Sequence, residues 1–397
     1  MRKKTIRDIE VSGKKVLVRV DFNVPLDNKT RTIVDDSRVR ATLPTIQYLI
    51  ECGAKVILMS HLGRPKGKAV NELSLTIVAQ RLSHILKKPV GMATDCIGPE
   101  AEKLVESLKS GDVLLLENLR FHSEEESGAN SFAKALAQLG DVFVNDAFGT
   151  SHRAHASITG IANYLPAVAG LLMEKEIKTL CSILENPPRP FALLIGGGKV
   201  SDKVNMLTNI ITNVDMMLIG GGIAVTFLKA QGYEVGLSPI ESDKLDIALG
   251  LIDKATRNGV RLLLPVDVVI SDRINQENKS AIVFINDIQK DKIITDIGPQ
   301  TINNFCRELS SCKTVFWNGP VGVYEIPQFS SGTRNMVSFL ATLRATTIIG
   351  GGSTAEIVYE MGLTNMMTFI STGGGASLKY LSGETLDGVA ALLDKES

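Results

Sequence analysis

The sequence predicts an α/β protein with two doubly wound, Rossmann-like domains built on parallel sheets. Short β-rich runs alternate with longer helical patterns along the whole chain. Many of these runs, such as AKVILMS at 54–60, are continuously apolar, as expected of strands covered by helices on both faces. The length of 397 residues also exceeds the ~250–300 residues over which one core grows, which favours two domains.

The strands of the two halves are separated by one long helical pattern. In the first half we expect strands at 14–22, 54–60, 112–118 and 141–148, and in the second at 190–195, 215–219, 260–270, 313–318, 345–349 and 366–370. Between them, residues 171–188 form a helical pattern ended by Pro187, Pro188 and Pro190. We interpret this segment as a connector helix with a hinge, between a domain at 1–170 and a domain at 189–379.

Composition excludes several classes of partner. Lys plus Arg and Asp plus Glu both total 43, so zero net charge favours neither nucleic acid nor an anionic membrane. The five cysteines include no C-x-x-C pair, which favours a reducing compartment. The first residues, MRKKTIRDIEVSGKK, lack the apolar core of a secretory signal, and no apolar run reaches the ~18 residues of a membrane span. We therefore expect a cytoplasmic protein that binds no membrane and no nucleic acid.

Four glycine triplets follow predicted strands of the second half. They begin at 196, 220, 350 and 373, so each pair is separated by one strand-helix-strand step and should follow neighbouring strands. A triplet can serve only as a tight turn, or its free N–H groups can bind a phosphate at a helix start. Four triplets favour phosphate binding. GGGSTA at 350–355 fits the dinucleotide pattern, but no acid near 370 follows to hold a ribose, and no triplet has the P-loop spacing.

Lysines follow the triplet at 196. A helix beginning directly after it would place Lys199 and Lys203 on one face of its first turn. Two ammonium groups at a helix start repel the dipole, so we predict that an anion lies between them. A solvated surface turn is the alternative.

Basic side chains follow several strands of the first half. In VRVDFNVP, Arg19, Asp21 and Asn23 are predicted to share one strand face. Arg38 should lie in the first turn of a helix capped by Asp36 or Ser37. Other strand ends carry His61 and Arg64, Arg120 and His122, and His152, Arg153 and His155. Together these groups predict a pocket for a small anion with carboxylate or phosphate groups. A histidine metal site is disfavoured, because the sequence shows neither an i, i+4 pair nor a nearby carboxylate.

The sequence resembles the phosphoglycerate kinase family along essentially its whole length. The resemblance rests on RVDFNVP at 19–25, SHLGRPKG at 60–67, ENLRF at 117–121, NDAFGTSHRAHAS at 145–157, GGGKVSDK at 196–203, WNGPVGVYE at 317–325 and STGGGASL at 371–378. It implies reversible phosphoryl transfer between 1,3-bisphosphoglycerate and ADP, giving 3-phosphoglycerate and ATP, in glycolysis and gluconeogenesis. It also implies a monomer, Mg²⁺ bound with the nucleotide, and a C-terminal tail at about 380–397 that packs back on the N-terminal domain.

The resemblance assigns residues to each substrate. The acid would be bound by Asp21, Phe22, Asn23, Arg38, His61, Leu62, Gly63, Arg64, Arg120 and Arg153. The nucleotide would be bound by Lys199, Lys203, Gly222, Asn318, Glu325, Gly350, Gly351, Gly352 and Ser353, with Glu325 on the ribose hydroxyls. Arg38, Lys199, Lys203, Gly352 and Gly375 would stabilise the transferred group. The carboxylate acceptor needs no general base, so catalysis reduces to alignment and charge neutralisation after the domains close.

Two positions depart from the family pattern. Ser353 stands where the family usually has an Asp that helps hold the metal, and Gly198 replaces the usual Ala. The resemblance therefore leaves the metal ligands of this chain unassigned. A hydroxyl brings no negative charge, so we expect a higher Mg²⁺ requirement, which Ser353→Asp should lower. Two alternatives stay open, an NAD-dependent dehydrogenase and a non-catalytic nucleotide- or anion-binding protein of the same fold.

Overall fold

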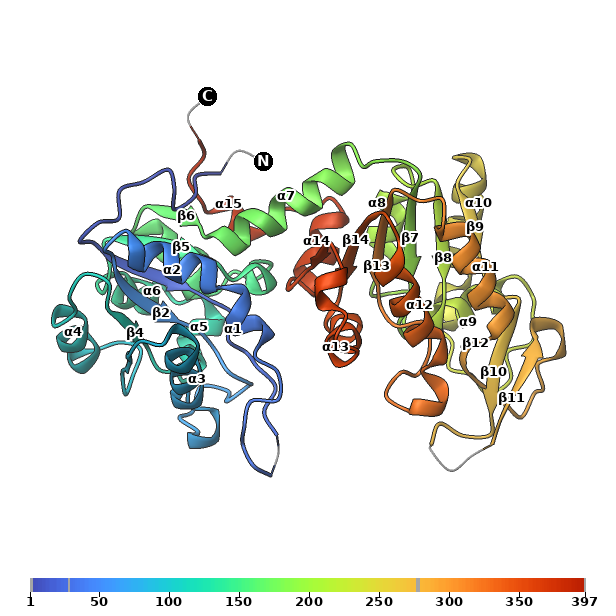
Figure 1. Cartoon of the computed structure of the whole chain (residues 1–397), viewed down its shortest axis with the longest axis horizontal. Helices are drawn as coiled ribbons and strands as arrows, with labels where there is room; N and C mark the ends of the chain where they lie inside the picture. The colour runs from blue at the N-terminus through green and yellow to red at the C-terminus, as the bar shows by residue number, and fades with distance from the viewer. Residues whose placement is uncertain (1–2, 28, 276–278, 396–397) are drawn as a thin grey trace. The chain divides into compact units, whose positions relative to one another are not determined.

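The computed structural model describes residues 3–27, 29–275 and 279–395. The chain forms two compact units (Figure 1). The N-terminal unit comprises Met1–Lys178 and Thr385–Ser397, and the C-terminal unit comprises Thr179–Glu384. The helix α7 (Leu171–Glu185) spans the boundary between these two stretches of chain.

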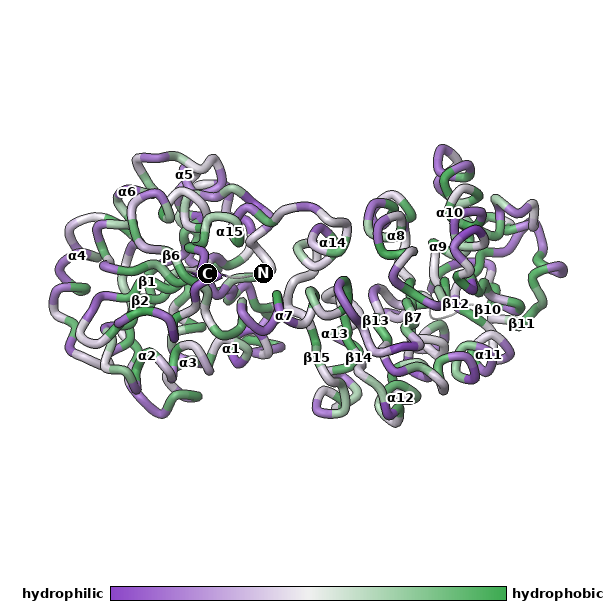
Figure 2. Tube along the Cα trace, turned by 90° about the horizontal axis from the view of Figure 1, so that it is seen from above, coloured by the Kyte–Doolittle hydropathy of each residue, from purple (hydrophilic) through white to green (hydrophobic). Residues whose placement is uncertain are grey.

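The N-terminal unit is built on a six-stranded parallel sheet with the order β3-β4-β2-β1-β5-β6. Its strands are β1 (Lys15–Arg19), β2 (Lys55–Met59), β3 (Val90–Met92), β4 (Val113–Leu115), β5 (Val142–Asn145) and β6 (Ala167–Ala169). The central strands β1, β2, β4 and β5 are almost entirely buried, and the sheet appears mostly hydrophobic in Figure 2. Burial on both faces explains why these segments read as continuous apolar runs.

Helices flank this sheet and place loops at the carboxyl ends of its strands. They are α1 (Ser37–Ala41), α2 (Leu43–Glu51), α3 (Thr76–Leu86), α4 (Pro99–Glu106), α5 (Ser123–Ser127) and α6 (Asn130–Ala137). The short α15 (Asp387–Ala390) joins the unit from the far end of the chain, where the amide of Asn145 donates to the carbonyl of Gly388 at 3.0 Å. None of the helices within the described ranges is long and apolar enough to cross a bilayer.

The C-terminal unit contains a second six-stranded parallel sheet, with the order β15-β14-β13-β7-β8-β9, and a small antiparallel sheet, β11-β10-β12. The parallel strands are β7 (Phe191–Ile195), β8 (Met216–Ile219), β9 (Arg261–Leu263), β13 (Thr314–Asn318), β14 (Thr346–Gly350) and β15 (Phe369–Ile370). The antiparallel strands are β10 (Asp267–Ser271), β11 (Ser280–Phe284) and β12 (Ile293–Ile297). The predicted α/β fold class is confirmed.

Helices of the C-terminal unit begin beyond the strand ends. They are α8 (Val204–Ile210), α9 (Gly221–Ala230), α10 (Leu245–Arg257), α11 (Pro299–Leu309), α12 (Ser331–Thr342), α13 (Gly352–Glu360) and α14 (Gly375–Leu381). The prediction that the glycine triplets follow neighbouring strands is confirmed, because β7 pairs with β8 and β14 pairs with β15. Three triplets lead directly into the helices α9, α13 and α14.

Candidate active site

The N-terminal unit brings Arg38 against Asp21. Arg38 is the second residue of α1, in the first turn after Asp36 at the N-cap position, as the sequence predicted, and its guanidinium meets the Asp21 carboxylate at 2.8 Å. The prediction that Asp21 lies within the strand is wrong, because β1 ends at Arg19. Asp21 therefore lies on the loop beyond the strand, where its carboxylate can orient Arg38.

A second group of contacts links Asn23, Gly63 and Arg120. The side-chain oxygen of Asn23 accepts a hydrogen bond from the Gly63 N–H at 2.8 Å, and Arg120 donates to the Gly63 carbonyl at 2.9 Å. Arg120 is 5% exposed, and its Nε finds no hydrogen-bond partner among the described residues. A buried guanidinium N–H without a partner costs free energy, so this group is suited to an incoming anion.

His61 is buried beside Arg19, and burial and the neighbouring Arg19 hold its pKa well below the usual value. The Arg19 guanidinium lies 3.2 Å from His61 Nδ1. Since a guanidinium can only donate, Nδ1 accepts, and the neutral ring carries its proton on Nε2. His61 can thus donate one hydrogen bond to an anion without being charged.

Arg19 was predicted to face a ligand, and the structure instead buries it. Its exposed fraction is 1%, and it donates to the Ser157 hydroxyl at 2.9 Å. Glu125, which is also buried, accepts from the Ser157 N–H at 2.9 Å, and its charge opposes the lowering of the Arg19 pKa by burial. Arg19 therefore supports the His61 ring through its contact with Nδ1 and is buried.

The remaining predicted acid-binding residues lie on neighbouring loops. Arg64 is exposed and Arg153 half-buried, and both positive charges contribute, after burial, to lowering the pKa of Arg120. The structure therefore brings Arg64, Arg120 and Arg153 close enough to interact electrostatically. The apolar Phe22 and Leu62 are buried, and the backbone of Leu62 is held by the Asn118 side chain at 2.8 Å.

His122 is not part of this group. Its Nε2 lies 2.7 Å from the Asp95 carboxylate, and Asp95, Cys96 and His122 together have ligand-type atoms within 4.8 Å of one another. The argument that no carboxylate lies near a histidine is therefore wrong for His122. Asp95 lies 27 residues earlier in the chain, so sequence spacing could not reveal the pair.

In the C-terminal unit, the glycine triplets serve two different purposes. Added side chains at Gly196 and Gly222 would come within 2.0 Å of the Pro320 carbonyl and 2.7 Å of the Gly198 carbonyl. These two glycines let backbone segments approach closely, so the turn interpretation holds for them. At Gly198 and Gly352 an added Cβ would meet nothing within 4 Å. Gly352 is the first residue of α13, and backbone that faces open space at a helix start can bind a phosphate.

The two lysines lie in a turn and not on a helix. The predicted helix directly after the triplet at 196 is wrong, because α8 begins at Val204 and Lys203 is its N-cap residue. Lys203 is buried, its ammonium group donates to the Gly196 carbonyl at 2.6 Å, and burial lowers its pKa to about 8. Lys199 is exposed.

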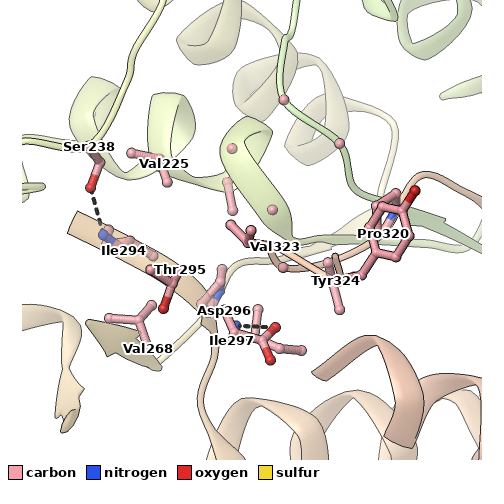
Figure 3. Close-up of a pocket in the computed structure, with 18 of the residues that line it drawn as sticks. Val225, Ser238, Val268, Ile294, Thr295, Asp296, Ile297, Pro320, Val323 and Tyr324 are labelled. Atoms are coloured by element: carbon pink, nitrogen blue, oxygen red, sulfur yellow. Dashed lines mark hydrogen bonds between the residues drawn. The ribbon is translucent and has the colours of Figure 1, made fainter. Parts of the chain in front are cut away.

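A cavity of about 330 Å³ adjoins these turns, lined by glycines and by apolar side chains of α9, β10 and β12 (Figure 3). This size is within the usual range for small-molecule sites. Gly222 and Glu325 line it, together with Val225, Ile294 and Tyr324. Asp296 lines it too and is buried, which raises its pKa to about 7. No pattern in the sequence pointed to Asp296.

Asn318 lies where β13 and β14 end side by side. It is paired with Gly350, is 3% exposed, and its Nδ2 has no hydrogen-bond partner within the described part of the chain. The same Nδ2 is 3.3 Å from the position of a Cβ on Gly351, the N-cap residue of α13. This helix start thus combines free N–H groups, open space and an unsatisfied amide. Ser353 is exposed in the first turn of α13, and Gly375 is the first residue of α14.

The N-terminal unit thus carries clustered guanidinium groups, and the C-terminal unit carries a glycine-lined pocket and a buried lysine, two sets of groups suited to binding anions. The sequence profile of the family described as "Phosphoglycerate kinase" matches residues 6–384. The chain belongs to the phosphoglycerate kinase family.

Relatives and solved structures agree with this family. Phosphoglycerate kinases of Dictyoglomus turgidum and Pelotomaculum thermopropionicum are each 52% identical to the chain, over 100% of both sequences. The structure of phosphoglycerate kinase from Coxiella burnetii covers 98% of each chain with a TM-score of 0.85 at 39% identity. That from Pyrococcus horikoshii covers 98% of each with a TM-score of 0.86 at 32% identity. The dehydrogenase and non-catalytic alternatives are not favoured.

Proposed function

We propose that the chain catalyses reversible phosphoryl transfer between 1,3-bisphosphoglycerate and ADP, giving 3-phosphoglycerate and ATP, as a step of glycolysis and gluconeogenesis. In this proposal the N-terminal unit binds the acid and the C-terminal unit binds the nucleotide. Two observations support it: guanidinium groups cluster in the N-terminal unit, and glycine backbone faces open space at a helix start in the C-terminal unit.

The acid is bound through charge and shape. Arg64, Arg120 and Arg153 hold its carboxylate and phosphate groups, because guanidinium groups match both bidentately. The neutral His61 adds a hydrogen bond, and Asp21 and Asn23 orient the neighbouring groups. Phe22, Leu62 and Gly63 shape the wall of this site.

The nucleotide is bound in the C-terminal unit. Its base and ribose occupy the cavity next to Gly222, with Glu325 on the ribose hydroxyls. Its phosphates lie against Gly350, Gly351 and Gly352, where Asn318 supplies the amide that lacks a partner. Lys199 and Lys203 neutralise the phosphate charge.

The chemical step needs no general base, since the accepting carboxylate of 3-phosphoglycerate is already ionised at neutral pH. Arg38, Lys199 and Lys203 stabilise the oxygens of the transferred group, assisted by N–H groups at Gly352 and Gly375. Because the two substrates bind to different units, the proposal includes a closing motion that brings donor and acceptor into line and excludes water.

A divalent cation is expected with the nucleotide, and the groups near α13 suit Mg²⁺. Mg²⁺ prefers oxygen ligands, and Ser353, Tyr324 and Glu356 all present oxygen atoms there. The cation neutralises phosphate charge when the nucleotide is bound. The proposal further places the enzyme in the cytoplasm as a monomer, without nucleic-acid or membrane partners.

A coupled assay of ATP formation tests the function. Purified protein supplied with 1,3-bisphosphoglycerate and Mg-ADP should form ATP, and omission of either substrate should abolish the signal. Reduction of NAD with a hydroxy acid, without ATP formation, would instead support a dehydrogenase. Binding of ADP without any turnover would support the non-catalytic alternative.

A further inference from the structure

The start of α13 lacks a carboxylate in its first turn, where the proposed function places the phosphates of a metal-bound nucleotide. Ser353 offers a hydroxyl group but no charge, and no acidic residue occurs in the first turn. Mg²⁺ bound to a nucleotide is usually held through at least one carboxylate. Another side chain within reach of this helix start should therefore supply it.

Tyr324 connects Ser353 to such a carboxylate. Its hydroxyl donates to Glu356 Oε2 at 3.1 Å and is also hydrogen-bonded to the Ser353 side chain. Glu356 follows Ser353 by three positions in α13, so both side chains lie on one face of the helix. Side chains on a helix lean toward its N-terminus, which directs the Glu356 carboxylate toward the phosphate end. One hydroxyl group thus separates the carboxylate from Ser353.

An independent feature shows that this helix start is built to receive a ligand. Asn318 is 3% exposed, and its Nδ2 lacks a partner among the residues described. That nitrogen lies 3.0 Å from the place of a Cβ on Gly350, two residues before α13 begins. Gly352 faces open space. A buried donor beside free helix N–H groups is suited to phosphate oxygens, which bring the metal with them.

Within the described ranges no ion pair involves Glu356, whereas Glu360, one turn further along α13, is paired with Arg334 at 2.7 Å. Glu325 lines the nucleotide cavity and Glu356 does not, so Glu356 stays available beside the helix start.

We infer that Glu356 is the carboxylate that binds the nucleotide-bound divalent cation, directly or through water, with Tyr324 and Ser353 holding it in place. This inference rests on the proposed nucleotide site. It replaces the expectation that the enzyme needs unusually high Mg²⁺, because the negative charge absent at Ser353 is supplied three residues further on. Tyr324 is then a positioning residue.

The test measures how strongly Mg²⁺ improves ADP binding. Calorimetry gives the Kd of ADP with and without Mg²⁺, and the ratio of the two isolates the metal contribution. Glu356→Gln should lower this ratio roughly tenfold while leaving metal-free ADP binding unchanged or slightly tighter. Glu356 is exposed, so the variant should fold. Glu360→Gln, which removes a carboxylate of the same helix, is the matched control and should leave the ratio unchanged.

A second variant and a second readout complete the design. Ser353→Asp combined with Glu356→Gln should restore the ratio, because the carboxylate then stands in the first turn. The electron paramagnetic resonance signal of Mn-ADP should broaden less in Glu356→Gln than in the native protein. An unchanged ratio in Glu356→Gln would overturn the inference while leaving the proposed function intact. Absence of ADP binding to the native protein would overturn both.

Discussion

The ammonium group of Lys203 donates a hydrogen bond to the Gly196 carbonyl at 2.6 Å, and the lysine side chain is buried. Burial of the charged group lowers its pKa to about 8 from the ordinary 10.5. Among the described groups, no carboxylate is in hydrogen-bond contact with this ammonium group. A buried cation of this kind destabilises the folded protein until an anion binds beside it. The relationship therefore indicates a site arranged for binding at the expense of stability.

Replacing Lys203 by Met should stabilise the fold while abolishing activity. Below pH 8 the lysine is protonated in both states, so the folded state bears a desolvation cost that Met removes. The gain in unfolding free energy at pH 7 should be on the order of 1–3 kcal/mol, after the lost hydrogen bond is deducted. Above pH 10.5 both states are neutral, and the gain should vanish. Urea unfolding at several pH values measures it, and Lys199→Met, at an exposed position, should show no gain.

Asp296 should make stability depend on pH in the opposite direction from most carboxylates. Burial raises its pKa to about 7, above the 3.8 of an unfolded chain. The stability that the protonated Asp296 side chain contributes to the fold is therefore fully present below pH 3.8. It is lost as the pH rises toward 7. Asp296→Asn lacks this loss, so its stability relative to the native protein should increase by on the order of 3 kcal/mol between pH 4 and pH 8. A constant difference across that range would contradict the assignment.

Two glycine variants separate packing from ligand binding. Gly352 faces open space, so Gly352→Ala should leave the melting temperature unchanged or slightly raised, and should weaken ADP binding roughly tenfold or more. Gly196→Ala would place its Cβ 2.0 Å from the Pro320 carbonyl and should destabilise the protein by about 2 kcal/mol or more. Equal loss of stability in both variants would contradict the distinction. Gly250→Ala, on α10 in open space, controls for helix propensity.

Arg38 should act in the chemical step more than in folding. Its side chain is 35% exposed and pairs with Asp21 at 2.8 Å. Arg38→Ala should lower kcat/KM roughly 10²- to 10³-fold, as expected for loss of one charge-stabilising donor, with little change in melting temperature. Arg40→Ala is the matched control, since Arg40 lies on the same helix and pairs with Asp36 at 2.8 Å. A similar loss of activity in both variants would contradict the role of Arg38.

Much of the architecture follows from local sequence. Continuous apolar runs indicate parallel strands because helices cover both faces of each sheet, and the spacing of the glycine triplets correctly paired β7 with β8 and β14 with β15. Both signals depend only on residues close together in the chain.

Contacts between distant residues decided what the sequence could not predict. The helix after Gly198 is delayed to Val204 because the Glu241 carboxylate, 40 residues further on, accepts from the Ser201 N–H at 3.1 Å and also from its hydroxyl. Arg19 points inward because it donates a hydrogen bond to the Ser157 hydroxyl. Ser157 lies next to it in space although it is 138 residues away in the chain. Spacing and composition carry no information on such contacts.

The most direct test of the two-site account is a crossed binding measurement by calorimetry on two exposed residues. Arg64→Ala should weaken binding of 3-phosphoglycerate roughly tenfold and change ADP binding less than about twofold. Lys199→Ala should weaken ADP binding to a similar degree and leave 3-phosphoglycerate binding unchanged. The assignment of the acid to the N-terminal unit and the nucleotide to the C-terminal unit would be contradicted if each variant weakened the binding of both ligands. It would also be contradicted if Arg64→Ala weakened only ADP binding and Lys199→Ala weakened only 3-phosphoglycerate binding.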